Sequence, residues 1–89
     1  MKYIIFKVKD FYHPVLFAEH TTHKQVTCEG GIPISAGFVS FTSTFRFPKC
    51  YGKSESLKLN SNPERDSEII RKFLDGFNMM SFYEPENEE

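Results

Sequence analysis

The clearest structural signal in this sequence is one amphipathic helix close to the C-terminal end. Asn62 is a typical N-cap residue, and Pro63 fits the first position of a helix. Apolar residues then recur at helical spacing as a single stripe: Ile69, Ile70, Phe73, Leu74 and Phe77. Gly76 indicates where the helix ends, so we predict it over residues 63–76. Such a helix has to bury its stripe against a second layer, and we expect Phe73 at the centre of that contact.

The sequence before this helix predicts that the second layer is a β-sheet. Four segments are predicted to be strands, near residues 2–8, 14–18, 34–47 and 51–59. The third segment is either one long strand or a hairpin that turns near residues 42–44. One of its parities is strongly apolar and is expected in the core: Val39, Phe41, Phe45 and Phe47. The predicted fold class is α+β, a mostly antiparallel four- to five-stranded sheet with one C-terminal helix packed on one face. Residues 1–83 are expected to form a single domain, and residues 84–89 a disordered acidic tail.

Length and composition exclude several classes of protein. The 89 residues suit one domain, and no apolar run approaches the roughly 20 residues that cross a bilayer. The first residues are too briefly apolar for a signal peptide, so we expect a cytoplasmic protein with two free cysteines, Cys28 and Cys50. Residues 1–58 carry eight Lys and Arg against four Asp and Glu, whereas residues 59–89 carry three against eight. This asymmetry favours an oriented interaction with a partner.

One short segment gathers the groups that could bind a metal. His13, His20 and His23 lie within eleven positions, and Cys28 follows. His20, His23 and Cys28 are the candidate ligands, because imidazole and thiolate suit zinc. The sequence contains no C-x-x-C and no H-x-x-x-H, and the capping-box spacing of Thr22 and Gln25 predicts a helical turn starting at His23, which Gly30 and Gly31 end. We therefore expect no metal and no cofactor, and interpret the histidines as polar loop residues.

The sequence does not assemble a catalytic site. Cys50 lies near Lys49 and Lys53, whose charge lowers a thiol pKa, and a histidine could serve as its base. There is no G-x-S-x-G, no glycine-rich phosphate loop and no useful carboxylate pair. A non-catalytic protein is therefore the preferred interpretation, with a small Cys/His hydrolase or metal-binding protein as an alternative.

Residues 45–53 favour a second alternative, the binding of single-stranded nucleic acid. Aromatic and basic residues interleave here, as on stacking platforms for bases: Phe45, Arg46, Phe47, Lys49, Tyr51 and Lys53. The strand parity places Phe45 and Phe47 in the core, which leaves Tyr51 as the natural exposed stacker.

Protein binding is the function that we prefer from the sequence. A two-layer domain leaves the second face of its sheet uncovered, and Tyr3, Ile5 and Phe38 would be apolar there. That face would bind a protein partner or a second copy of the chain as a homodimer. The hypotheses of protein binding and of nucleic-acid binding together give these candidate binding residues: Tyr3, Ile5, Phe38, Arg46, Lys49, Tyr51 and Lys53.

The chain resembles small uncharacterised single-domain proteins of bacterial and phage genomes. The resemblance lies in three stretches: "HPVLFAEHTTH", "SAGFVSF" and "CYGKSESLKLNSNPERDSEII". The resemblance covers about His13 to Ile70 and carries no motif diagnostic of an activity. It implies a stand-alone cytosolic protein of a phage or mobile element. By analogy with anti-CRISPR proteins, such a protein would bind and inhibit a host complex.

Overall fold

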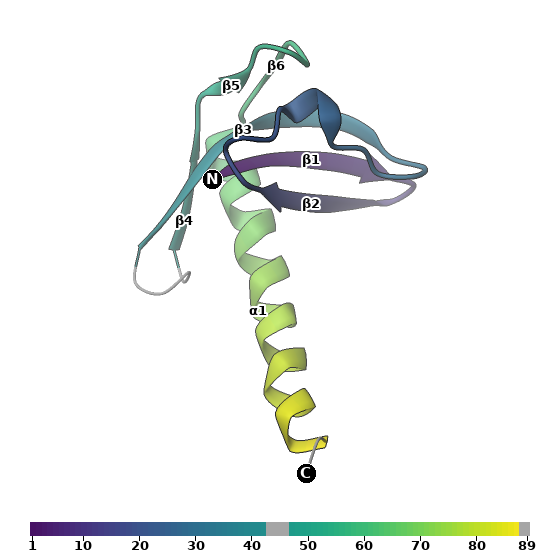
Figure 1. Cartoon of the computed structure of the whole chain (residues 1–89), viewed down its shortest axis with the longest axis vertical. Coiled ribbons are helices and arrows are strands. Elements are labelled where there is room, and N and C mark those ends of the chain that lie inside the picture. Colours follow the sequence, from purple (N-terminus) through teal and green to yellow (C-terminus); the bar gives the residue numbers. More distant parts are fainter. Residues whose placement is uncertain (43–46, 88–89) are drawn as a thin grey trace.

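The computed structural model describes residues 1–42 and 47–87, with side chains described as far as Gly76. The elements follow one another as β1 (Lys2–Val8), β2 (Phe11–Phe17), the short 3₁₀ helix η1 (His23–Gln25), β3 (Ile32–Thr42), β4 (Phe47–Tyr51), β5 (Lys53–Ser54), β6 (Leu59–Asn60) and α1 (Pro63–Asn87). Four strands form one sheet, β5 and β6 form a separate small hairpin, and α1 packs against the sheet (Figure 1). The predicted α+β fold class is confirmed.

The main sheet has the strand order β2-β1-β3-β4, and all its neighbouring strands are antiparallel. The third segment forms the hairpin and not one long strand: β3 ends at Thr42, and Phe47 begins β4, which pairs antiparallel with β3. A single strand over residues 51–59 is also wrong, because the chain turns at Gly52 and again at Lys58. Both residues have positive φ, 79° and 58°, which a continuous strand does not allow.

The start of α1 confirms the predicted cap. The Arg65 N–H donates to Asn62 Oδ1 at 3.4 Å, and the Asn62 N–H donates to Asp66 Oδ2 at 2.9 Å. These two bonds satisfy backbone donors that a helix start leaves open. The predicted end at Gly76 is wrong, because Gly76 lacks the positive φ of a helix-ending glycine and α1 continues to Asn87.

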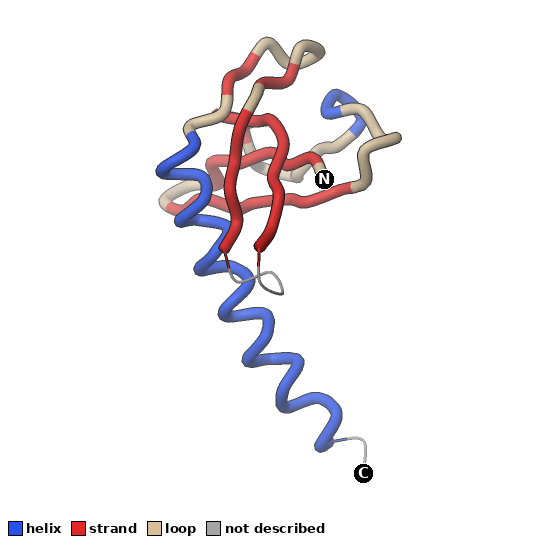
Figure 2. Tube along the Cα trace, turned by 90° about the vertical axis from the view of Figure 1, so that its left-hand side faces the viewer, coloured by secondary structure: helices blue, strands red, loops and turns tan. Residues whose placement is uncertain are grey.

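The backbone of α1 therefore extends past the sheet (Figure 2). Two expectations concern this end of the chain. Phe77 belongs to the part of α1 whose side chains lie outside the described residues. The expected tail overlaps α1 at residues 84–87, and residues 88–89 lie outside the described residues, so the domain limits at residue 83 stay a prediction.

The core between the sheet and α1 is the larger of two apolar clusters. It joins residues of β1, β3 and β4 to one helix residue: Tyr3, Ile5, Val39, Cys50 and Ile70, all at most 1% exposed. The sequence predicted Phe73 at the centre of this contact, and this prediction is wrong. It is 40% exposed, and its ring meets His13 of the edge strand β2 edge-on, with centroids 5.9 Å apart. Ile70 takes the central place because it faces the inner strands.

The opposite face of the sheet is covered only in part. Ile4, Phe6 and Ala36 form its buried centre. Apolar residues of the chain between β2 and β3 and of the β5–β6 hairpin pack on it, among them Val26, Cys28, Leu57 and Leu59. The predicted turn at His23 is present as η1, but it ends at Gln25, well before Gly30 and Gly31. This cover lies over β1 and the neighbouring part of β3, and the outer strand β4 extends beyond it.

Candidate functional site

The exposed face of β4 carries two aromatic rings with a lysine between them. Phe47, Lys49 and Tyr51 alternate along the strand with Pro48 and Cys50. Cys50 belongs to the core beneath α1, so alternation puts the other three on the opposite face of the sheet. Phe47 is 58% exposed and Tyr51 is 48% exposed. We call Phe47, Lys49 and Tyr51 the β4 strip.

The sequence placed Phe47 in the core, and this is wrong. Its parity was counted from Val39 and Phe41, as if one strand ran through to residue 47. Because β4 is a separate strand, its register decides the face: Phe47 lies opposite Thr42 and Lys49 opposite Ser40. Phe45 and Arg46 lie outside the described residues.

The backbone edge of β4 is closed, although β4 is the last strand of the sheet. The Val39 N–H donates to the Met1 carbonyl, so Cys50, opposite Val39, turns its own N–H outward. There the Cys50 N–H donates to Ser67 Oγ of α1 at 3.1 Å. Pro48, two residues before, has no N–H, and the Gly52 carbonyl accepts from the Ser61 N–H at 3.0 Å. An edge without a free N–H at Pro48 or Cys50 disfavours pairing with another strand, so we expect the β4 strip to bind through its side chains.

Aromatic rings continue from the β4 strip across the sheet. Phe38 of β3 stacks on Tyr51, with centroids 5.8 Å apart and an interplanar angle of 25°. His23 meets Phe38 edge-on at 6.0 Å and Phe17 edge-on at 5.4 Å. The row runs from Tyr51 at the surface to Phe17 and joins the β4 strip to the cover of the sheet.

A shallow hollow of about 530 Å³ opens beside this row. We call it the His23 hollow. The residues that line it include Lys2, His23, Phe38, Lys53, Glu55 and Ser56. His23 is only 4% exposed, and its Nε2 lies 3.0 Å from the Gly37 carbonyl oxygen. Because a carbonyl oxygen only accepts hydrogen bonds, this contact requires a proton on Nε2, which donates a hydrogen bond to the Gly37 carbonyl.

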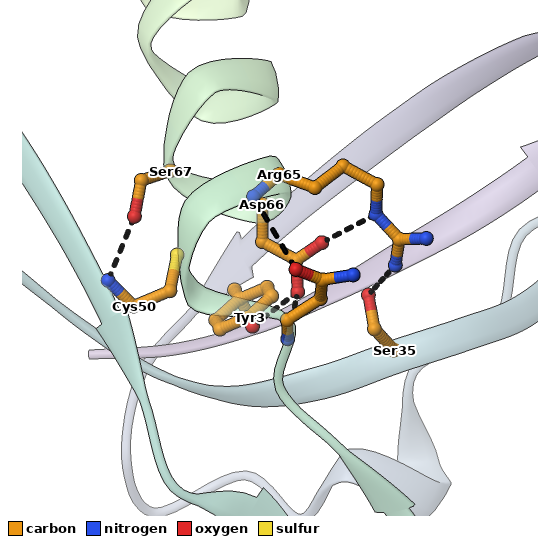
Figure 3. Close-up of polar contacts among 7 residues, drawn as sticks. Tyr3, Ser35, Cys50, Arg65, Asp66 and Ser67 are labelled. Atoms are coloured by element: carbon orange, nitrogen blue, oxygen red, sulfur yellow. Dashed lines mark hydrogen bonds and ion pairs between the residues drawn. The ribbon is translucent and has the colours of Figure 1, made fainter.

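The face beneath α1 contains a buried polar network (Figure 3). The Tyr3 hydroxyl donates to Asp66 Oδ2 at 2.6 Å, and the Arg65 Nε–H donates to Asp66 Oδ1 at 3.2 Å. Arg65 also donates to Ser35 Oγ at 3.0 Å. Burial, reinforced by the hydrogen bond to Asp66, raises the pKa of Tyr3 far above its ordinary value. Asp66 is fully buried and satisfied by these donors, so the network ties α1 to β1 and β3.

The hypothesis of a catalytic Cys50 finds no support in this geometry. Cys50 is 1% exposed beneath α1, and burial raises the pKa of its thiol, opposed in part by Ser67 and Tyr3. A nucleophilic cysteine needs the reverse, a lowered pKa and access to substrate. The lysines on either side in sequence belong to the exposed surface, away from the thiol.

The three candidate metal ligands take different surroundings. His23 is buried against Gly37, Cys28 is half-buried in the cluster around Ile4, and His20 is exposed. Across residues 1–42 and 47–76, no three His, Cys, Asp or Glu side chains are placed to hold a metal ion together. The hollow beside His23 brings lysines and an aromatic ring to this histidine in place of further ligands.

The candidate binding residues divide between the two faces of the sheet. Tyr3 and Ile5 are fully buried beneath α1, so the expected uncovered face containing them is wrong. The expectation failed because α1 packs on the face of β1 that carries Tyr3 and Ile5, and the other face of β1 is covered by the chain between β2 and β3 and by the β5–β6 hairpin. Phe38 lies half-buried on the other face, where the structure brings it together with Lys49, Tyr51 and Lys53.

The sequence-based interpretation missed two residues of this surface, Phe47 and His23. The signal for Phe47 was the chain reversal between β3 and β4, which a turn near residues 42–44 had already suggested. For His23 the capping box fixed the start of the turn but not the direction of the side chain.

No protein-family model, no curated protein and no solved structure matches this chain. Among the described residues, no helix is long and apolar enough to cross a membrane. We therefore infer the function from the arrangement of side chains described above.

Proposed function

We propose that this chain is a non-catalytic binding protein and that the β4 strip binds single-stranded nucleic acid. The observation that carries the proposal is the alternation of Phe47, Lys49 and Tyr51 on one exposed face of β4. Exposed rings stack unpaired bases of any sequence, and an ammonium group between them neutralises a phosphate. At about 3.3 Å per residue, the two rings stand roughly 13 Å apart along the strand, with Lys49 midway.

On the side of the His23 hollow, the charge beside the β4 strip supports this choice. The strip belongs to the half of the sequence in which Lys and Arg exceed Asp and Glu. Lys53 and Lys2 lie close by at the His23 hollow, where Glu55 is the acidic neighbour. The closed edge of β4 is also consistent with a ligand bound through side chains, since a nucleic acid needs no strand pairing.

A protein partner is a second candidate, supported by a separate feature. A groove of about 480 Å³ runs between β4 and α1, and its lining includes Phe47, Glu64 and Glu68. Lys49 and Arg71 line the same groove, so an exposed phenylalanine beside charges of both signs suits a segment of another protein that carries both charges. This candidate keeps the expectation of a protein that inhibits a host complex. Dimerisation through Tyr3 and Ile5 is not kept, because both are buried.

The test is fluorescence anisotropy with a labelled single-stranded oligonucleotide of mixed sequence and its duplex as competitor. We expect tighter binding of the single strand and an affinity that falls as salt rises. Phe47→Ala or Tyr51→Ala should weaken binding about 5- to 150-fold, the range that base stacking on one aromatic ring spans. Lys49→Ala should reduce the slope of log affinity against log salt by about 0.7. The matched control is Lys72→Ala, a 72% exposed lysine on α1.

Two results would overturn the proposal. One is the absence of saturable binding to single strands at about 50 mM salt, where phosphate contacts are strongest. The other is binding that Phe47→Ala and Tyr51→Ala leave unchanged. A nuclease-resistant complex with a purified protein, lost in a Glu64→Lys and Glu68→Lys double variant, would support the second candidate instead.

A further inference from the structure

The spacing of the two rings on the β4 strip limits the kind of strand that can bind there. Phe47 and Tyr51 lie four residues apart on β4, so at about 3.3 Å per residue their Cα atoms stand roughly 13 Å apart. The bases of a stacked strand follow one another at about 3.4 Å, so such a strand reaches from one ring to the other only in about four steps. The strip therefore distinguishes a stacked strand from an extended one.

A stacked strand does not suit this spacing. Its inner bases are covered on both sides by their neighbours, and an aromatic side chain stacks on such a base only after the base has been freed. The exposed side chain of Lys49, on the same face of β4, also interrupts any pile of bases between the two rings. An extended strand covers the roughly 13 Å in two steps of about 6.5 Å each, so the rings meet its first and third bases.

Tyr51 offers a single, fixed face to a base. Phe38 of β3 stacks on the other face of its ring, with centroids 5.8 Å apart and an interplanar angle of 25°. A Cβ atom added at Gly52 would lie 3.0 Å from Phe38 Cδ2, so the backbone of this turn packs closely on the Phe38 ring. Because Phe38 is held from behind and Tyr51 is 48% exposed, one base can stack on the outer face of Tyr51 without any rearrangement.

The surface between the two rings is polar. Ser40 of β3 lies opposite Lys49 in the register, and both side chains are exposed on the same face of the sheet. The ammonium group of Lys49 and the hydroxyl group of Ser40 are hydrogen-bond donors, which suits phosphate oxygens. The middle nucleotide of an extended strand therefore meets groups that hold its phosphates, and its base meets no aromatic ring of the strip.

We propose that the β4 strip binds an extended segment of three nucleotides, with the first and third bases on Phe47 and Tyr51 and the phosphates of the middle nucleotide at Lys49 and Ser40. This inference rests on the proposed function and names the ligand that the same site prefers. Because the strand has to be unstacked before it binds, runs of thymidylate, which stack weakly, bind more tightly than runs of adenylate, which stack strongly.

The experiment titrates the full chain with single-stranded oligothymidylates and oligoadenylates of increasing length, starting from the dinucleotides, and follows the NMR signals of Phe47, Lys49 and Tyr51. From two to three thymidylates we expect at least about a tenfold gain in affinity, a difference of about 1.4 kcal/mol, and only a gradual gain beyond three. Phe47→Ala and Tyr51→Ala should each remove this gain, because only one ring is left. Lys72→Ala on α1 is the matched control and should keep it.

A second series uses the unaltered chain, so that it does not depend on the folding of a variant. Trithymidylate is compared with three analogues that each lack one base. We expect loss of the first or the third base to weaken binding at least about tenfold, the effect of one stacked base, and loss of the middle base to leave the affinity nearly unchanged.

The outcomes separate this footprint from the proposed function. If dithymidylate binds as tightly as trithymidylate while long strands still bind through Phe47 and Tyr51, the footprint of three nucleotides is overturned and the proposed function stands. If loss of the middle base weakens binding most, or if adenylates bind as tightly as thymidylates at every length, the extended arrangement is overturned. If no strand of any length binds saturably, the proposed function fails together with the footprint.

Discussion

The two faces of the sheet differ in how completely they are closed. Beneath α1, the central residues Tyr3, Ile5 and Ile70 are fully buried, and the carboxylate of Asp66 is surrounded by donors. On the other face, the cover stops short of β4 and leaves Phe47 and Tyr51 about half exposed. The helix face therefore has stability as its main role, whereas the β4 side retains groups that packing does not require.

Buried polar side chains are paired on both faces. Among the described residues, no fully buried side-chain nitrogen or oxygen lacks a hydrogen-bond partner. Around Asp66 three donors converge, from Tyr3, Asn62 and Arg65. On the other face, His23 Nε2 lies 3.0 Å from the Gly37 carbonyl oxygen.

The largest effect is expected for Ile70→Ala, which empties the centre of the helix face. We expect a loss of about 2–5 kcal/mol in the free energy of unfolding, because the side chain is fully buried between α1 and the sheet. Phe73→Ala, three residues further along α1 and 40% exposed, is the matched comparison and should cost roughly 1 kcal/mol. Urea denaturation measures both. A larger loss for Phe73→Ala would mean that α1 docks through a different side.

Tyr3→Phe should cost about 1–3 kcal/mol, because it takes one donor from a buried carboxylate and leaves the packing almost unchanged. The substitution is measured by the same denaturation experiment. A cost close to zero would show that Asp66 does not need the Tyr3 hydroxyl and that the remaining donors suffice.

Alkaline pH should destabilise the protein through the same hydroxyl. Burial and the hydrogen bond to Asp66 raise the pKa of Tyr3, so the folded chain keeps this proton where the unfolded chain loses it. The contribution is complete below about pH 10, the unfolded value, and falls by up to about 1.4 kcal/mol per pH unit above it. Phenolate absorbance should show that one of the four tyrosines ionises only as the chain unfolds. The late ionisation should be absent from the Tyr3→Phe variant, which would identify Tyr3 as the tyrosine responsible.

The two cysteines should differ in reactivity, because they lie on the two faces. Cys50 is buried beneath α1 with a raised thiol pKa, whereas Cys28 is only half-buried on the partly covered face. Alkylation at pH 8, followed by mass spectrometry, should modify Cys28 at least about tenfold faster. Equal rates would indicate that α1 detaches from the sheet readily.

The smallest effect on stability is expected on the β4 strip. Phe47→Ala and Tyr51→Ala should each change the free energy of unfolding by about 1 kcal/mol or less, since both rings are about half exposed. Differential scanning calorimetry checks this. A loss comparable with that of Ile70→Ala would place these rings in the core and remove them from the candidate surface.

The sequence predicted the helix start and β1 well because the signals there are local. Asn62 and Pro63 act within one turn, and β1 contains four consecutive apolar residues, Tyr3 to Phe6, all of them buried. It failed where long-range pairing decides the outcome. The face of Phe47 depends on where the chain reverses, and the burial of Tyr3 depends on β1 being a central strand. The orientation of His23 likewise depends on the Gly37 carbonyl, fourteen residues away.

The most direct test of the division between the two faces measures, for one variant, its affinity for single-stranded nucleic acid and its free energy of unfolding. The Phe47→Ala/Tyr51→Ala double variant is titrated with the labelled single strand, and its free energy of unfolding is determined in the same buffer. We predict an affinity at least about tenfold weaker, as loss of base stacking requires, with a stability within about 1–2 kcal/mol of the unaltered chain. Unchanged affinity in a stably folded double variant would contradict the assignment of the β4 strip as the binding surface.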